Sequence, residues 1–472
     1  MVGYKRPEDD VPESQTIRKF PVLYKLGVKR RAELERLLRQ YKDFLGKALI
    51  PPDIVDEVVR QSQLKTHNYH EGLHPEKKCF IVNKERSCFA LVKYGNRALE
   101  YGLRIIMVHN DSPCLMVKKK PELFEWDPDL KELYTGARLD TEPYGSINPH
   151  QWVGQNVLLT GWTSRTNYTI RKLKPTPAYI PDKAIHTESD SRASDATMDE
   201  AFPHESLDVI LGNESRKAMR RFLKLQVQTD KDFACSRFYV IPDNRPQILD
   251  NYYITGYGQD DTHAVFAGMK ALHRANPSHT CILIGFDKEE IGSMGKEGAQ
   301  GKFFDNLIED LVYMEPRKHR TKDILQRRIT RVLKNSYAMN FDGELAATHA
   351  EFGELDQNNV ARLGYGPFVC AHDGAMEDEQ TSPFLVRRMH NLCENPFKRK
   401  RIKIKAQFIG SPHKAGKVEG LSTMSVYLTH RGVETVRAGA PLGSMHSPAE
   451  LMHFGDEYYA ILLAQAFFES NQ

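Results

Sequence analysis

One short apolar run followed by two acids constrains the fold of this chain more than any other feature. Cys281–Phe286 is apolar, branched and uninterrupted, which is typical of a strand buried on both faces. Glu289 and Glu290 come shortly after it. Open α/β sheets bind their ligands beyond the carboxyl ends of strands, so the two acids are candidates for a functional site. The alternative is a pair of solvated loop acids.

The backbone conformation after this strand decides what each acid can do. Neighbouring side chains on an extended chain point in opposite directions. We therefore expect one of Glu289 and Glu290 to bind a metal while the other faces substrate. Gly292 and Ser293 then interrupt the pattern, and we expect a helix to open there.

Strand patterns alternate with helical patterns over much of the chain. Apolar side chains recur at helical spacing in residues 29–63, 261–275, 303–313, 321–333, 382–392 and 457–468. Strand patterns occupy residues 87–94, 103–108, 336–341 and 435–440. Ser382 and Pro383 are typical of the N-cap and the first position of a helix. The alternation predicts an α/β fold with a mostly parallel central sheet flanked by helices.

The segment between residues 118 and 245 has a different character. Short strand candidates lie at residues 157–162, 168–173, 221–227 and 238–241, and polar loops such as residues 187–199 separate them. After residue 245 the alternation of strands and helices returns. We interpret residues 118–245 as an inserted β-rich domain.

Composition and charge indicate which classes of protein the chain does not resemble. The 472 residues include 66 Lys and Arg against 62 Asp and Glu, a net charge of +4 that favours no polyanionic partner. No apolar segment resembles a signal peptide or a membrane span, and the seven cysteines form no C-x-x-C pair. We expect a soluble, cytoplasmic protein with reduced thiols and no membrane partner. Basic residues 398–405 alternate with isoleucines, so we interpret them as an edge strand rather than a nucleic-acid site.

Several positions after predicted strands or in turns carry side chains that bind metals. They are His109, Asp260, Glu290, Asp342 and His446. Nitrogen and hard oxygen donors together suit zinc, manganese or cobalt. Two ions ~3.5–4 Å apart need one shared carboxylate and about two terminal ligands each, which five residues supply. Glu289 is then left to take a proton from the attacking water and to deliver it to a leaving amine.

These residues lie in motifs that resemble those of one protein family. The chain is similar to the aspartyl aminopeptidase and aminopeptidase I family of dinuclear metallopeptidases, in the family's motif order and over nearly the whole length. The matching segments are His109-Asn110-Asp111-Ser112-Pro113, Glu142-Pro143-Tyr144-Gly145, Ala184-Ile185-His186, Asp260, Glu289-Glu290-Ile291-Gly292-Ser293, Gly298-Ala299, Asp342 and Ser444-Met445-His446-Ser447.

The resemblance implies a role for each matching residue. Asp260 would bridge two metals, with His109 and Asp342 completing one site. Glu290 and His446 would complete the other site, and Glu289 would be the general base. His186 would bind substrate in the active site of a neighbouring subunit.

The resemblance also implies an architecture and an assembly. Residues 1–117 and 246–472 would form a split catalytic domain, and residues 118–245 would be a dimerisation domain. Because members of the family form tetrahedral dodecamers, we expect a homo-oligomer of twelve subunits built from dimers.

The chain departs from the family's pattern at three places. Gly258 and Asp261 stand where the family has an Arg before and an Asn after the bridging acid. Asp261 is therefore either an alternative bridge or a source of repulsion for acidic substrates. Leu345 and Thr348 stand where the family has histidines, and residues 419–424 replace a segment rich in Gly and Thr. The preferred N-terminal residue of the substrate stays open between acidic, neutral and basic.

Together these features predict a metal-dependent aminopeptidase that hydrolyses the N-terminal residue of peptides. The attacking water would be held by two divalent ions, with zinc expected and cobalt or manganese as alternatives. Two other functions use the same features: a related metal-dependent deacylase, and a non-catalytic oligomeric scaffold that keeps a structural metal. Substrates with free and blocked amines separate the two enzymes, and metal analysis with an activity assay tests the scaffold.

Overall fold

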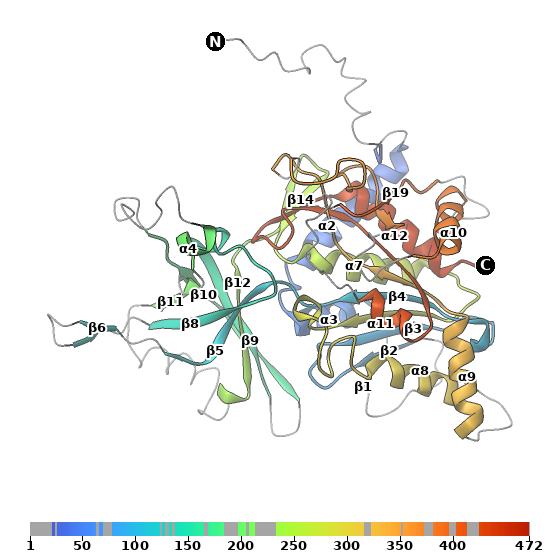
Figure 1. Cartoon of the computed structure of the whole chain (residues 1–472), viewed down its shortest axis with the longest axis horizontal. Coiled ribbons are helices and arrows are strands. Elements are labelled where there is room, and N and C mark those ends of the chain that lie inside the picture. Colours follow the sequence, from blue (N-terminus) through green and yellow to red (C-terminus); the bar gives the residue numbers. More distant parts are fainter. Residues whose placement is uncertain are drawn as a thin grey trace, which may run out of the picture.

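The protein consists of a β-barrel beside a larger body built on a wide sheet (Figure 1). The structure is a computed structural model. It describes residues 21–23, 26–62, 66–68, 78–122, 125–127, 132–134, 137–164, 169–183, 197–203, 207–212, 233–315, 322–350, 353–371, 381–395, 403–412 and 424–471.

The wide sheet has nine strands in the order β1-β2-β3-β15-β4-β16-β20-β18-β19. Their bounds are β1 Thr66–Asn68, β2 Lys78–Val82, β3 Phe89–Lys93, β4 Arg104–His109, β15 Cys281–Phe286, β16 Tyr337–Phe341, β18 Phe368–Cys370, β19 Gln407–Ile409 and β20 Glu434–Gly439. Its four central strands, β15, β4, β16 and β20, run parallel. The mostly parallel sheet expected from the sequence is therefore confirmed.

The side chains of β15 alternate between two cores, one on each face of the sheet. Cys281 and Leu283 belong to the core under α2 (Val28–Leu45), α3 (Pro51–Ser62), α7 (Gln259–Arg274), α10 (Pro383–Glu394) and α12 (Phe454–Phe468). Ile282, Ile284 and Phe286 pack on the opposite face beneath α8 (Phe303–Met314), α9 (Lys322–Lys334) and α11 (Ser425–Thr429). An uninterrupted apolar strand is thus explained by burial on both faces.

The predicted helices form close to their expected positions. Ser382 is the N-cap of α10, where its hydroxyl accepts a hydrogen bond from the Leu385 amide at 3.2 Å. Pro383 occupies the first helical position, where the missing N–H leaves no partner unsatisfied. Capping and apolar spacing were together sufficient to place this helix.

The barrel closes in the order β10-β11-β8-β5-β12-β9. Its strands are β5 Cys114–Glu122, β8 Ala137–Tyr144, β9 Gln155–Ser164, β10 Ile170–Ile180, β11 Val209–Gly212 and β12 Ser236–Pro242. It has a core of its own, which includes Leu115, Trp152, Val157 and Val240. The hairpin of β6 (Glu125–Asp127) and β7 (Glu132–Tyr134) and the short helix α4 (Met198–Ala201) belong to the same region. The strand expected at residues 221–227 lies outside the described residues.

A second, five-stranded sheet includes the short strands that directly follow β16 and β20. It contains β13 (Gln247–Leu249), β14 (Tyr253–Gly256), β17 (Glu344–Leu345), β21 (Pro441–Gly443) and β22 (Glu450–His453). All seven cysteines are free, as expected. Within the described part of the chain, no helix combines the length and the apolar character needed to cross a bilayer.

Candidate metal centre

The central strands end together at one edge of the sheet. Three of the predicted ligands lie at or just after these strand ends. Phe286 of β15 pairs with His109, the last residue of β4. Asn340 of β16 pairs with Met107, so Asp342 emerges beside His109. Glu290 follows β15 by four residues. This edge is where open α/β sheets bind ligands.

The two adjacent acids stand in a tight turn instead of an extended segment. Residues Glu289–Ile291 form a single 3-10 turn, which Lys288 enters with a φ of 69°. Asp111 holds this turn, because its Oδ1 accepts the Glu289 amide at 3.0 Å and its Oδ2 accepts the Glu290 amide at 3.1 Å. A carboxylate oxygen from each acid lies within 4.8 Å of a ring nitrogen of His109. The expectation that the pair diverges is therefore wrong: the turn brings both carboxylates toward one centre.

The helix expected at Gly292 and Ser293 is also absent. Gly292 has a φ of 88° and Ser293 a φ of 58°, and a helix cannot continue through such left-handed residues. The next helix, α8, begins only at Phe303. Gly292 and Ser293 correctly indicated that the preceding segment ends, but they did not indicate which structure follows it.

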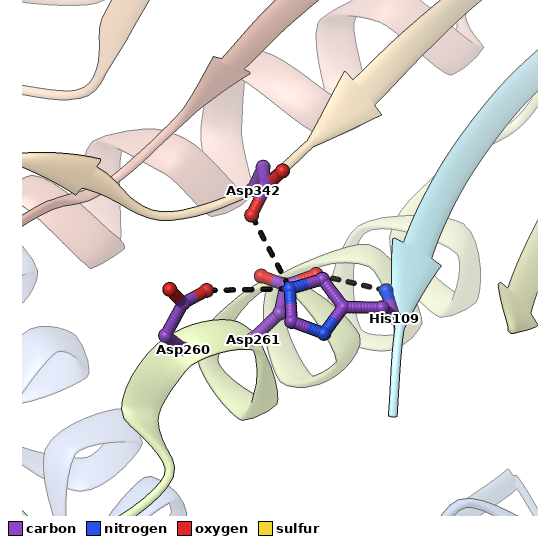
Figure 2. Close-up of side chains that lie close together, drawn as sticks. All are labelled: His109, Asp260, Asp261 and Asp342. Atoms are coloured by element: carbon purple, nitrogen blue, oxygen red, sulfur yellow. Dashed lines mark hydrogen bonds and ion pairs between the residues drawn. The ribbon is translucent and has the colours of Figure 1, made fainter. Parts of the chain in front are cut away.

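Asp260 lies between two histidines and faces each with a different oxygen. Its Oδ1 is 3.3 Å from Nε2 of His109, and its Oδ2 is 3.5 Å from Nε2 of His446. Asp342 Oδ1 lies 3.4 Å from the same His109 nitrogen, and Glu290 Oε2 lies 3.4 Å from the same His446 nitrogen. Figure 2 shows the His109 half, with Asp260 and Asp342 converging on the ring. The structure thus brings together all five predicted ligands in two groups that share Asp260.

Both histidine rings are fixed by backbone carbonyls on their far side. His109 Nδ1 is 3.0 Å from the Asp111 carbonyl, and His446 Nδ1 is 3.0 Å from the Ser146 carbonyl. A carbonyl only accepts, so each Nδ1 carries a proton and a neutral ring presents a lone pair at Nε2. Lone pairs that face carboxylate oxygens repel unless a cation lies between them. The ring orientations are therefore those of metal ligands.

The site has an excess of buried negative charge. Asp111, Asp260, Asp261, Asp342 and Glu450 are all at most 6% exposed. Asp260 Oδ1 and Glu290 Oε1 are buried without a hydrogen bond. Burial disfavours protonation of His446, but with no cation bound Glu290 and Asp260 raise its pKa to about 10, so a proton on Nε2 then takes the place of the metal ion. Buried charges of one sign need compensation, and metal cations supply it.

The spacing of the ligand atoms fits zinc. Nitrogen and oxygen ligands lie ~2.0–2.2 Å from zinc, so two of them in a tetrahedral arrangement are about 3.4 Å apart. The four histidine–carboxylate separations at this site are 3.3, 3.4, 3.4 and 3.5 Å. They are too long for strong hydrogen bonds and match pairs of atoms that share an ion. The residues present therefore fit two such ions.

Two acids that support the ligands had no assigned role in the sequence interpretation. Asp111 orients the Glu289–Glu290 turn and the His109 ring. Glu450 accepts the Asp260 amide at 3.1 Å and the His446 amide at 2.9 Å, so it joins the shared ligand to a terminal one. Asp111 stands in a quoted motif and could have been suspected. Glu450 lies in β22 of the second sheet, and no local sequence pattern connects it with Asp260.

The sequence also singled out His186 and Asp261, and the structure describes only the second of them. His186 lies outside the described residues. Asp261 is 1% exposed, its Oδ2 accepts the His109 amide at 3.0 Å, and its Oδ1 faces His263 at 3.5 Å. The carboxylate is thus turned toward the His109 backbone and His263, while it also lies among the donor atoms of His109, Asp260 and Asp342.

The barrel contributes directly to this centre through the end of β8. The Tyr144 hydroxyl donates to Asp111 Oδ2 at 2.9 Å, and the Ser146 carbonyl orients His446. Gly145 between them has a φ of 75°, and a Cβ there would come within 3.1 Å of the Glu290 Cβ. A side chain at this position would press on a ligand, so glycine lets the barrel approach the site.

Replacing Tyr144 by phenylalanine is expected to weaken the centre without unfolding the protein. The variant removes one of the hydrogen bonds that hold Asp111, and loss of such a supporting contact lowers metal affinity or activity by ~10–100-fold. Tyr257→Phe is a matched control, because that buried hydroxyl donates to the Pro113 carbonyl and does not touch Asp111. Zinc affinity of the two purified variants is the measurement. Equal affinities would show that Tyr144 only stabilises the fold.

Fold and site together define a metal-dependent hydrolase of the α/β metallopeptidase class. Residues 55–468 match the family described as aminopeptidase I zinc metalloprotease (M18). Because this match covers most of the chain, the protein belongs to the M18 family: it is a zinc metalloaminopeptidase, a hydrolase.

Relatives of similar length support this family membership. The chain is 26% identical to a probable M18 family aminopeptidase 1 of Borrelia garinii, over 94% of this chain and 98% of the relative. It is also 26% identical to one from Thermotoga maritima, over 93% and 97%. An M18 aminopeptidase structure from Thermotoga maritima superposes with a TM-score of 0.82 at 23% identity, covering 95% of this chain and 98% of that one. A Saccharomyces cerevisiae structure described as the mApe1 dodecamer gives a TM-score of 0.69 at 15% identity, covering 92% and 96%.

Proposed function

We propose that this aminopeptidase acts with two divalent ions in each subunit, both of them zinc. The observation that carries the proposal is the position of Asp260, whose two oxygens face two different histidines at 3.3 and 3.5 Å. A carboxylate shared in this way is what a pair of ions requires. Cobalt and manganese accept the same donors and are the alternatives.

Each ion has its own terminal ligands in this proposal. His109 and Asp342 hold one ion, and Glu290 and His446 hold the other. When bound, the ions polarise the scissile carbonyl and lower the pKa of a water molecule. The supporting contacts of Asp111 and Glu450 keep the ligands in place before metal arrives, so little reorganisation is needed on binding.

Glu289 is the proton-transfer residue in this proposal. It shares the 3-10 turn with Glu290, but its carboxylate has no place in the group formed by Asp260, Glu290 and His446. Burial, followed by the charges of Asp342, Asp111 and Asp260, raises its pKa to about 8, although His109 opposes the shift. Bound cations would lower this pKa again, and the carboxylate would then take a proton from water and pass it to the leaving amine. Asp111 fixes the Glu289 amide and so limits where the carboxylate can reach.

The substrates are peptides with a free N-terminal amine. We expect aminoacyl chromogenic substrates to be hydrolysed, their N-acetylated forms to be inert, and a chelator to abolish turnover until zinc is restored. A panel of acidic, neutral and basic aminoacyl groups, measured with zinc, cobalt and manganese, gives the preference as kcat/KM. Hydrolysis of the blocked substrates at a similar rate would instead identify a deacylase.

The barrel is proposed as the dimerisation domain, and the whole protein as a dodecamer of such dimers. Residues 118–245 would then be the inserted domain between residues 1–117 and 246–472. Support comes from the barrel's separate core and from a relative whose structure is described as a dodecamer. In such an assembly His186 would reach the site of a neighbouring subunit and bind substrate there.

A further inference from the structure

Three buried side chains, two acids and a histidine, lead away from the metal centre into the helical layer. Asp261 is 1% exposed, and His263 and Glu457 are fully buried. His263 Nδ1 lies 3.1 Å from Glu457 Oε2, and its Nε2 lies 3.5 Å from Asp261 Oδ1. The three side chains come from α7 and from the first turn of α12, which pack side by side on one face of the sheet (Figure 1).

Asp261, at one end of this row of side chains, contacts the backbone of a metal ligand. Asp261 Oδ2 accepts the His109 amide at 3.0 Å, as Figure 2 shows behind the imidazole ring. His109 is the last residue of β4, where the ladder of the sheet ends. A hydrogen-bond acceptor for the His109 amide at this point fixes the backbone of His109 and, with it, the imidazole ring.

Asp261 also lies close enough to be considered as a ligand. One of its oxygens is within 4.8 Å of the donor atoms of His109, Asp260 and Asp342. However, Oδ2 is used by the His109 amide, and Oδ1 is directed toward His263. The hydrogen bond to Oδ2 makes this carboxylate a support for the His109 backbone, and the imidazole of His263 packs against its other oxygen.

The imidazole of His263 lies between two buried acids. Its Nδ1 is hydrogen-bonded to Glu457 at 3.1 Å, and its Nε2 faces Asp261 at 3.5 Å. His263 is hydrogen-bonded to Glu457 and packs against Asp261, so it limits where the Asp261 carboxylate can move. The tertiary contact between α7 and α12 is thereby linked to the position of a metal ligand.

We propose that Asp261, His263 and Glu457 form a positioning network that fixes His109 and so raises the affinity of the centre for zinc. The proposal rests on the metal site proposed above. It assigns Asp261 a role as an acceptor for the His109 amide, not as a ligand or an alternative bridge. Outer contacts of this kind typically change metal affinity by ~10–100-fold.

Substitutions at Asp261 distinguish an acceptor from a ligand. In Asp261→Asn the amide oxygen still accepts the His109 N–H, so zinc affinity is expected to stay within about threefold of wild type. In Asp261→Ala the acceptor is lost, and affinity is expected to fall by ~10–100-fold. The readout is the zinc dissociation constant of the full-length protein, measured by competition with a chromophoric chelator. Equal losses in the two variants would overturn the proposal, because only a ligand requires the carboxylate itself.

A variant further from the ions tests the network if Asp261→Ala does not fold. His263→Gln is expected to weaken zinc binding by ~10-fold, since the imidazole that packs between Asp261 and Glu457 is lost. His279→Gln is the matched control: this buried histidine contacts the Gly102 carbonyl at the opposite end of β4 and should leave the affinity unchanged. Wild-type affinity in His263→Gln would overturn the network while leaving the metal site intact. Absence of zinc binding by the wild type would instead overturn the site itself.

Discussion

Replacing Glu289 by glutamine is expected to leave two zinc ions bound and to lower kcat by about 10²–10⁴-fold. Glutamine keeps the shape of the side chain and the amide that Asp111 accepts, so the turn should persist. It cannot take up a proton from water or return one to the leaving amine. Thermal unfolding should change little, because the side chain is not a ligand in either group that shares Asp260.

The adjacent substitution provides the sharpest control for this result. Glu290→Gln changes the neighbouring carboxylate in the same turn, and there we expect loss of zinc from the His446 side of the site. Glu309→Gln, on the exposed face of α8, should match wild type in both metal content and turnover. Full activity of Glu289→Gln, or loss of zinc from it, would remove the proton-transfer role from Glu289.

Replacing Asp260 by asparagine is expected to empty both metal positions. Asp260 lies 3.3 Å from Nε2 of His109 and 3.5 Å from Nε2 of His446, so in the proposed site each ion loses a ligand at once. The ions contribute several kcal/mol to stabilisation of the transition state, and each ~1.4 kcal/mol is a factor of ten in rate. Activity should therefore fall by about 10³-fold or more. Zinc content per subunit and kcat/KM are the two measurements.

Asp310→Asn on α8 is the corresponding control for loss of one negative charge. Its side chain is half-buried and lies outside the centre, so zinc content and turnover should be unaffected. If Asp260→Asn retained two ions, another acid would have to bridge them. In that case Asp261 would be the first residue to test, because it lies in the same group of donors.

The central part of the fold could be predicted because strands buried on both faces have a distinctive composition. Cys281–Phe286 forms β15 with the predicted bounds, and its last residue pairs with His109. Once several parallel strands are placed, their carboxyl ends meet by geometry alone. Residues far apart in the sequence, such as His109, Glu290 and Asp342, could therefore be assigned to one edge of the sheet from strand patterns and ligand chemistry.

The conformation of the Glu289–Glu290 turn could not be predicted from local pattern. Lys288, a residue with no preference for positive φ, adopts 69° because Asp111 accepts the two amides that follow. That contact joins positions 178 and 179 residues apart. Long-range hydrogen bonds of this kind override the local conformational preference of a residue. The periodicity of apolar residues in the sequence does not reveal them.

The hydrogen bonds that support the ligands could not be predicted from the sequence for the same reason. Glu450 meets Asp260 across 190 residues, and His263 meets Glu457 across 194. Neither pair has a spacing that marks it in the sequence. The sequence showed that Asp261 departs from the family pattern, but not that its carboxylate turns toward the His109 amide and His263.

A crystal structure of the zinc-loaded protein, with anomalous data collected at the zinc edge, tests the proposed centre most directly. We expect two anomalous peaks in each subunit, ~3.5–4 Å apart. One should lie within coordination distance of His109, Asp260 and Asp342, and the other within coordination distance of Asp260, Glu290 and His446. A single peak, or two peaks that do not share Asp260, would contradict the dinuclear site on which the proposed mechanism depends.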